Sequence, residues 1–423
     1  MDDRLIINIK HRTQAQWLTW LMLIITFLLG VCVQMFHFPS VMKYSLDLLW
    51  VILVLYMVKS HKVFPWKEIG FLFGWLTAFL VITLINYSYN YQSVLYYLWG
   101  FRNNFRFYIL FIACVFFMRE SDVENVFKVF DKMFWLNTIL CIVQYYGMGK
   151  SQDYLGGLFG IEQGCNGALN LFLVVIVVKS IVFYLNQKEK IVWCLTKCGI
   201  VLVISAFAEL KFFYIEFVLI VSIAILITKF SFRKLLIVIA AILGLVASVT
   251  LLINQFPFFA EFFNIESMLG SATDVSGYTG GGDMNRFTGI AIVNERFLGE
   301  FREKMFGMGL GNCDYASFEF LKTPFFSQYE GLHYTWLSTA WIYLENGIVG
   351  LVMFFGFFVA VATSMLRKLK FKSGDKSTFQ VIFIVSICCI LVGVYNSSLR
   401  SDAAYLIYFV LSMGFWKKEI SNE

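Results

Sequence analysis

Twelve apolar stretches, each close to the length of a membrane-crossing helix, constrain this chain of 423 residues most strongly. A bilayer core is crossed by roughly 20 helical residues. The stretches lie near residues 17–36, 41–58, 69–85, 105–118, 133–147, 168–185, 191–208, 212–228, 234–253, 347–366, 378–395 and 402–416. Only 15% of the residues are charged, whereas a soluble domain carries roughly a quarter. The sequence therefore predicts an all-α, polytopic integral membrane protein with about 12 transmembrane helices.

Lysine and arginine concentrate in alternate connections between these stretches. Seven segments, counted from the N-terminus to the C-terminus, hold twenty-one of them. The short connections between those segments hold only Arg102, Lys150, Lys211 and Arg400. Because cytoplasmic loops are the ones enriched in lysine and arginine, the pattern predicts that both termini are cytoplasmic. It also accounts for the net charge of +6 without a nucleic-acid partner.

The same topology divides the chain into three parts. Residues 1–253 form an N-terminal membrane domain of about nine spans, and residues 347–423 form a C-terminal hairpin and last span. Between them, residues 254–346 form one large extracytoplasmic loop with short helices, between spans 9 and 10. Cys165 and Cys313 both fall in predicted extracytoplasmic segments, and the sequence leaves open whether they pair.

Arginines on the predicted outer side work against the positive-inside bias and so need a reason. Arg102 and Arg106 lie four residues apart, which places both on one helical face. Their planar guanidinium groups suit a phosphate or pyrophosphate ligand, or equally lipid headgroups. Within the long loop, Arg286 precedes a predicted amphipathic helix near 287–305 that carries Arg296.

Two further residues complete the candidate site. Lys211, with Glu209, marks the predicted outer turn between the seventh and eighth spans, where it either pairs with neighbours or adds positive potential to a cavity. His333 is the histidine of the long loop, and its neutral imidazole could remove a proton from a hydroxyl near neutral pH. A histidine that only forms hydrogen bonds at the interface is the other interpretation. No set of metal ligands accompanies it in the sequence.

Two segments then carry a family resemblance. FGMGLGN (306–312) looks like a G-x-G-x-G-N segment, and GLHYTWLSTAWIYLENGIVGL (331–351) looks like an H-N-x-x-L … E-x-G-x-x-G segment. With the topology, they resemble the O-antigen polymerase (Wzy) and O-antigen ligase superfamily of bacterial membrane glycosyltransferases. His333 and Glu345 stand at the family's histidine and glutamate positions. Tyr334 replaces the usual asparagine, and Lys211, in Glu-Leu-Lys, stands where members show Ser-Arg.

The resemblance implies a chemistry and a place for it. A glycan on undecaprenyl pyrophosphate is transferred to an acceptor hydroxyl, with no metal and no cofactor. The resemblance implies that His333 and Arg286 are catalytic. The residues expected to bind substrate are Arg102, Arg106, Lys211, Arg296, Glu345 and Arg400. The expected partners are a lipid-linked oligosaccharide, membrane lipid and a chain-length regulator protein, at a bacterial cytoplasmic membrane with the active site facing outside.

We therefore expect a polymerase of repeat units for an O-antigen, capsule or exopolysaccharide. A ligase that moves finished glycan to another acceptor uses the same chemistry and stays open. From another class, a flippase or transporter of lipid-linked glycans also stays open. Transporters tend to show internal repeats and polar sites at the bilayer midplane, whereas the polar cluster here lies in one long loop.

Overall fold

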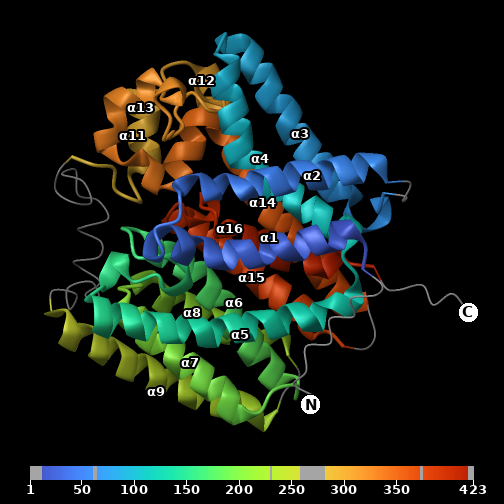
Figure 1. The fold of residues 1–423 in the computed structure, drawn as a ribbon, viewed down its shortest axis with the longest axis vertical. Coiled ribbons are helices and arrows are strands. Elements are labelled where there is room, and N and C mark those ends of the chain that lie inside the picture. The colour runs from blue at the N-terminus through green and yellow to red at the C-terminus, as the bar shows by residue number, and fades with distance from the viewer. Residues whose placement is uncertain (1–11, 61–63, 229–230, 258–281, 372–374, 418–423) are drawn as a thin grey trace, which may run out of the picture.

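The computed structural model of this chain describes residues 12–60, 64–228, 231–257, 282–371 and 375–417 (Figure 1). Within these ranges the regular structure is helical, apart from one isolated bridge between Arg119 and Lys417. The longer helices are α1 (Gln14–Gly30), α2 (Ser45–Lys59), α3 (Trp66–Asn90), α4 (Val94–Phe117), α5 (Val123–Ile142), α6 (Cys165–Leu185), α7 (Ile191–Phe207), α8 (Lys211–Ile227), α9 (Phe232–Gln255), α14 (Ser338–Phe371) and α15 (Ser377–Tyr395). The shorter ones are α11 (Gly289–Arg296), α12 (Phe301–Phe306), α13 (Pro324–Tyr329) and α16 (Ala404–Ser412).

Each of the predicted apolar stretches falls on a helix of the described ranges. Seven helices there are long and apolar enough to cross a membrane: Gln14–Met35, Ser40–Lys59, Trp66–Asn90, Cys165–Leu185, Phe232–Gln255, Ser338–Phe371 and Ser377–Tyr395. The prediction of a helical protein suited to a membrane is confirmed, and the predicted number of twelve spans stays a prediction. The helix α4 is not among the seven, because Arg102, Asn103, Asn104 and Arg106 interrupt its apolar sequence.

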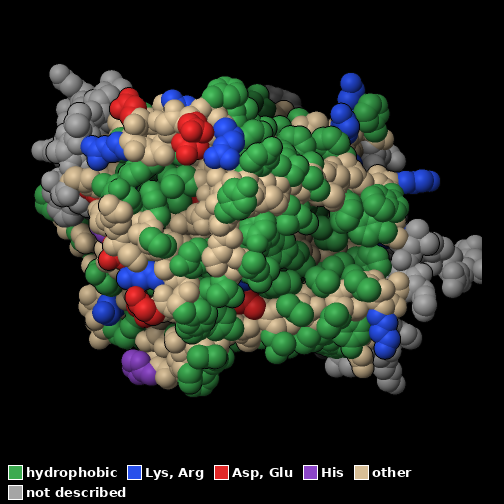
Figure 2. Space-filling model, turned by 90° about the horizontal axis from the view of Figure 1, so that it is seen from above, with side chains coloured by type: hydrophobic (Ala, Val, Ile, Leu, Met, Phe, Trp, Pro, Cys, Tyr) green, Lys and Arg blue, Asp and Glu red, His purple; other side chains and the backbone are tan. Residues whose placement is uncertain are grey.

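The outer surface of the helices is strongly apolar. Large side chains such as Val58, Leu226 and Leu243 are 80%, 80% and 66% exposed. Figure 2 shows one face of the molecule, on which apolar side chains cover a broad central area and charged groups gather toward the edges. This surface matches a lipid environment, where helices satisfy their own backbone hydrogen bonds. At the centre of the bundle, α6 is almost entirely buried and packs against α7, α8 and α15.

The segment between α9 and α14 carries the short helices α11, α12 and α13, which gather at one end of the molecule (Figure 1). Residues 258–281 of the predicted long loop lie outside the described ranges. The predicted single amphipathic helix near 287–305 is wrong. Instead α11 ends at Arg296, and α12 begins at Phe301 after Glu300, whose side chain accepts from the first turn in a capping box.

The segment Phe306–Asn312 packs tightly against α14, and we call this contact the glycine junction. The N–H of Met308 donates to the carbonyl of Leu344 at 2.9 Å, and the N–H of Gly309 donates to that of Glu345 at 3.0 Å. At this point α14 is broken by Gly347, whose φ of 63° and ψ of −163° suit glycine. A Cβ on Gly347 would lie 2.3 Å from the carbonyl carbon of Met305. The glycine spacing of both motif segments is thus explained by close backbone approach.

Cys165 and Cys313 are both buried and both free thiols. Cys165 begins α6, where its thiol contacts the carbonyl of Asp153 at 3.4 Å. Cys313 follows the glycine junction, and its carbonyl accepts from the hydroxyl of Tyr334 at 2.7 Å. The two residues that the sequence left open as a pair therefore belong to separate contacts.

Candidate functional site

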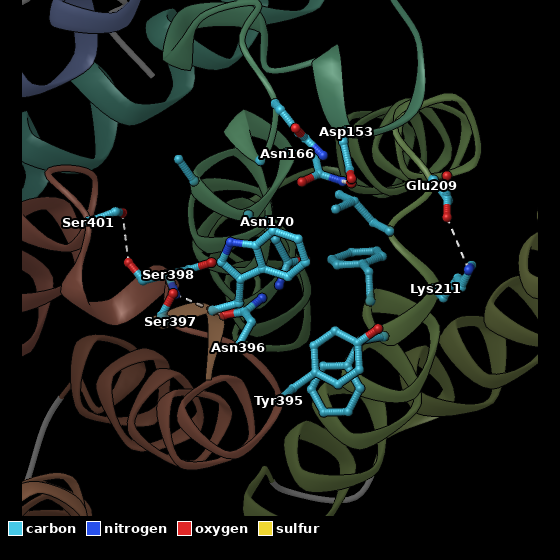
Figure 3. Close-up of a pocket in the computed structure, with 18 of the residues that line it drawn as sticks. Asp153, Asn166, Asn170, Glu209, Lys211, Tyr395, Asn396, Ser397, Ser398 and Ser401 are labelled. Carbon is cyan, nitrogen blue, oxygen red and sulfur yellow. Dashed lines mark hydrogen bonds and ion pairs between the residues drawn. The ribbon is translucent and has the colours of Figure 1, made fainter. Parts of the chain in front are cut away.

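A polar cavity of about 440 Å³ lies where four connections between helices meet (Figure 3). They are the α5–α6, α7–α8 and α15–α16 connections and the long segment between α9 and α14, all of them predicted to be extracytoplasmic. The lining residues are Asp153, Gln163, Gly164, Asn166, Gly167, Ala168, Asn170, Glu209, Leu210, Lys211, Phe212, Phe213, Arg286, Trp336, Tyr395, Asn396, Ser397, Ser398 and Ser401. The cavity therefore brings together Lys211 and Arg286, two residues far apart in the sequence and both predicted for the site.

The tight turn between α7 and α8 presents Glu209 and Lys211 to this cavity (Figure 3). Glu209 has a left-handed φ of 56°, and the N–H of Leu210 donates back to the carbonyl of Ser205 at 2.9 Å. The ammonium group of Lys211 lies 3.0 Å from the Glu209 carboxylate. Burial raises the pKa of Glu209, and the positive charges of Lys211 and Arg286 oppose that rise. Glu209 is thus electrostatically linked to both cations.

Arg286 rests on an aromatic stack. Its guanidinium carbon lies 4.2 Å from the centre of the Tyr395 ring, which in turn stacks on Phe212 at 4.1 Å with 5° between the planes. A cation over an aromatic face is attracted by the ring quadrupole. The stack joins three parts of the chain, namely the long loop, the end of α15 and the start of α8. It holds Arg286 at one wall of the cavity.

The first turns of α6 form another wall. The side-chain amide of Asn166 donates to the Asp153 carboxylate at 2.8 Å and to the carbonyl of Ala208 at 3.0 Å. A Cβ on Gly167 would lie 2.4 Å from the hydroxyl oxygen of Ser398. Deeper in the bundle, Asn170 donates to the buried Glu216 at 2.9 Å. These contacts fix the α5–α6, α7–α8 and α15–α16 connections against one another.

His333 lies next to the cavity through Trp336. The imidazole stacks on the Trp336 ring at 3.9 Å with 8° between the planes, and Trp336 lines the cavity. His333 itself has a left-handed φ of 51° and is partly exposed. A backbone hydrogen bond joins the segment that carries His333 to the segment that carries Arg286, because the N–H of Met284 donates to the carbonyl of Leu332 at 2.9 Å.

The remaining predicted residues lie outside the lining of the polar cavity, and three are paired arginines. Arg102 forms an ion pair with Asp47 at 2.6 Å, and Arg106 forms one with Asp402 at 2.8 Å. Arg400 is buried, with its guanidinium carbon 3.5 Å from the centre of the Trp341 ring.

Glu345 and Arg296 complete the predicted set. Glu345 belongs to the glycine junction, where it accepts from the N–H of Gly311 at 3.1 Å and lies 3.6 Å from Arg400. Arg400 also faces Asp314 at 3.9 Å. Burial raises the pKa of Asp314, and the charge of Arg400 opposes that rise. Arg296 is exposed on α11.

Several lining residues were missed by reasoning from the sequence. Tyr395, Asn396, Ser397, Ser398 and Ser401 form the α15–α16 connection and line the cavity. The available signal was a short polar run, NSSLRSD (396–402), between two apolar helices. Trp336 and Asp153 carried no comparable signal.

No known protein family matches this chain, and no curated protein sequence matches it. The class that can be stated is a helical protein with several helices suited to a membrane.

Proposed function

We propose that this chain is a membrane glycosyltransferase that polymerises lipid-linked repeat units, with the polar cavity as its active site. The observation that carries the proposal is the convergence of the predicted outer connections on one cavity that contains Lys211 and Arg286. The resemblance of the two motif segments to the O-antigen polymerase and ligase superfamily supports the same chemistry.

The two cations suit a pyrophosphate leaving group. As the bond between sugar and phosphate breaks, negative charge grows on the pyrophosphate, and donors fixed in advance stabilise such charge. The Tyr395–Phe212 stack limits the movement of Arg286, whose planar fork can bind two phosphate oxygens at once. Lys211 lies at the start of α8, paired with Glu209.

The rest of the lining suits sugars. Trp336 and Phe212 add aromatic surface to the lining, while Asn396 and the serines of the α15–α16 connection offer hydrogen-bond donors and acceptors. A pocket of aromatic rings with a few well-placed polar groups is the usual form of a small-molecule site.

The reaction needs one proton acceptor. The acceptor hydroxyl oxygen forms a bond to the anomeric carbon, the bond from that carbon to the pyrophosphate oxygen breaks, and the hydroxyl proton passes to a base. Two side chains compete for this role. His333 was predicted from the sequence and contacts the lining through Trp336, whereas Glu209 lines the cavity directly. The raised pKa of Glu209 brings it closer to the neutral range that suits a general base.

Genetic complementation tests the proposal in cells. In a deletion strain we expect single lipid-linked repeat units to accumulate, and the wild-type chain to restore long glycans. Arg286→Ala and Lys211→Ala should fail to restore them at normal protein level, because each removes a charge from the leaving-group site. Arg302→Ala is the matched control, since Arg302 lies outside the cavity, over Tyr89 at 5.8 Å.

Three other outcomes would contradict parts of the proposal. Long lipid-linked chains in the deletion strain would indicate a ligase rather than a polymerase. Repeat units trapped on the cytoplasmic face would indicate a flippase. Full-length polymer from both Arg286→Ala and Lys211→Ala would remove the polar cavity from the mechanism.

A further inference from the structure

A second cavity, of about 230 Å³, shares part of its wall with the polar cavity. Gln163, Gly164, Ala168 and Ser401 belong to both linings. The other residues of the second cavity come from α1, from the segment that follows α1, from the α5–α6 connection, from the first residue of α6 and from the α15–α16 connection. They are Thr26, Leu29, Gly30, Val33, Gln34, Lys43, Phe159, Glu162, Cys165, Asp402 and Ala403.

This shared wall matters for a reaction between two lipid-linked substrates. In glycosyl transfer the acceptor hydroxyl must come within roughly 3–3.5 Å of the anomeric carbon. An acceptor site therefore has to adjoin the donor site. The second cavity does so, whereas the apolar groove between α2, α3 and α4, lined by residues such as Val54 and Phe116, shares no lining residue with the polar cavity.

One carboxylate of the second cavity is fixed by a glutamine. Val31–Met35 forms a π-helical turn at the end of α1, an irregularity frequent at functional sites. It places Gln34, whose side-chain oxygen accepts from the N–H groups of Ile161 and Glu162 at 2.6 and 3.0 Å. The amide of Gln34 donates to the Glu162 carboxylate at 3.0 Å. Glu162 is thereby oriented before any ligand binds.

The other carboxylate is fixed by a buried arginine. Arg106, whose side chain is 4% exposed, lies 2.8 Å from Asp402, whose side chain is 29% exposed. Arg106, predicted as a phosphate ligand, thus positions Asp402 in the second cavity. Lys43 is exposed at the same cavity and forms no ion pair with any residue in the described ranges. Its ammonium group is available to a ligand.

The two cavities differ in the charged residues that line them. The polar cavity has two carboxylates and two cations, whereas the second cavity has two carboxylates and one cation, Lys43. Arg106 already neutralises Asp402 from behind the wall, which leaves Lys43 as the cation of this lining that can face an anion. One ammonium group beside two carboxylates suits neutral hydroxyl groups better than a pyrophosphate, because hydroxyl groups donate to carboxylates and accept from an ammonium group. We infer that the second cavity binds the terminal sugar of the acceptor repeat unit, with Glu162, Asp402 and Lys43 contacting its hydroxyl groups. This inference rests on the proposed function.

The test uses the purified full-length protein and measures the apparent KM for the donor and for the acceptor separately. The donor probe is lipid-linked repeat unit isolated from the deletion strain, and the acceptor probe is the oligosaccharide released from it by mild acid. Lys43→Ala removes a charged donor and should raise the apparent KM for the released oligosaccharide by roughly tenfold or more. Val33→Trp should do the same by filling the cavity. Both variants should leave the KM for the donor unchanged.

Val41→Trp is the matched control, because Val41 is 67% exposed and lines neither cavity. If Val33→Trp does not fold, Lys43→Ala alone carries the test, since Lys43 is an exposed side chain. An unchanged acceptor KM in Lys43→Ala, or a rise in the donor KM instead, would overturn the inference while the proposed function stands. A wild-type protein that lengthens no glycan would overturn the proposed function and the acceptor site with it.

Discussion

Two candidate bases stand at the polar cavity, Glu209 in its lining and His333 next to it, and their surroundings differ. Glu209 is held beside Lys211 at 3.0 Å, and its pKa is raised by burial. His333 stacks on Trp336 at the edge of the same cavity. Because proton transfer works best when the pKa of the base lies near the working pH, the choice between them is visible in the dependence of the rate on pH.

If Glu209 is the base, activity requires its deprotonated form. Burial raises its pKa above the usual value of 4.5, so the rate should fall as the pH drops through that raised pKa, at a higher pH than for an ordinary carboxyl group. Glu209→Gln should then lower kcat by about 100-fold or more across the whole pH range, while His333→Ala keeps the acidic limb. Rates of glycan lengthening measured from pH 4 to 8 show which of Glu209 and His333 is the general base. Near-normal kcat in Glu209→Gln together with loss of activity in His333→Ala would assign the role to His333.

Lys211 and Arg286 could be predicted as site residues from the sequence, because cations are scarce in the predicted outer segments. The same reasoning grouped Arg102, Arg106 and Arg400 with them, yet each of these lies against a carboxylate from a distant part of the chain. A pairing such as Arg102 with Asp47 depends on how α2 packs on α4, which single-sequence patterns do not specify.

Among the larger elements, the glycine junction joins the long loop to α14. Gly347 has backbone angles that other residues adopt only with strain, and a Cβ there would meet the backbone of Met305. Gly347→Ala should therefore destabilise the protein by at least about 3 kcal/mol. Thermal unfolding in detergent measures the loss. Gly74→Ala is the control, because Gly74 lies within α3 with nothing within 4 Å of the added methyl group.

The control should be neutral or stabilising by up to about 1 kcal/mol, since alanine is the better helix former. Equal unfolding temperatures for the two variants would mean that the glycine junction does not hold the loop. The motif glycines could be read from the sequence, but their structural role could not, because it depends on two segments meeting across about forty residues of chain.

A cluster of four charged residues joins α5, α6 and α7 at the end of the bundle away from the polar cavity. Lys179 and Lys197 each bind both Asp131 and Glu189, at distances from 2.6 to 3.3 Å. The two lysine side chains are only 7% and 6% exposed. The four groups therefore form a closed arrangement in which each charge faces two opposite charges.

Asp131→Asn should destabilise the protein by about 2 kcal/mol or more, because it leaves two nearly buried lysines with one carboxylate. The midpoint of unfolding in detergent checks this loss. Glu124→Gln removes an exposed ion pair to Lys128, in which the Glu124 side chain is 66% exposed. It should change the midpoint little. A similar shift in both variants would argue that the four-charge contact contributes no more than a surface pair.

Across the whole molecule, the helical architecture was accessible from the sequence because apolar length is a local property. The convergence of four connections on one cavity was only implied by their shared side of the predicted topology. The packing of α6 among α7, α8 and α15 brings Asn396 and Lys211 to the lining of one cavity. At the predicted boundary after residue 346, α14, which begins at Ser338, is broken at Gly347.

Reconstitution of the purified protein shows whether the polar cavity transfers a lipid-linked glycan. Purified wild-type protein and Arg286→Ala would each be placed in liposomes with purified lipid-linked repeat units, and the glycans separated by size. We predict a ladder of lengthened glycans from the wild type and, because a leaving-group contact of this kind contributes about 100- to 1000-fold, only traces from Arg286→Ala. Unchanged single repeat units with the wild-type protein, or the same ladder from both proteins, would contradict the account.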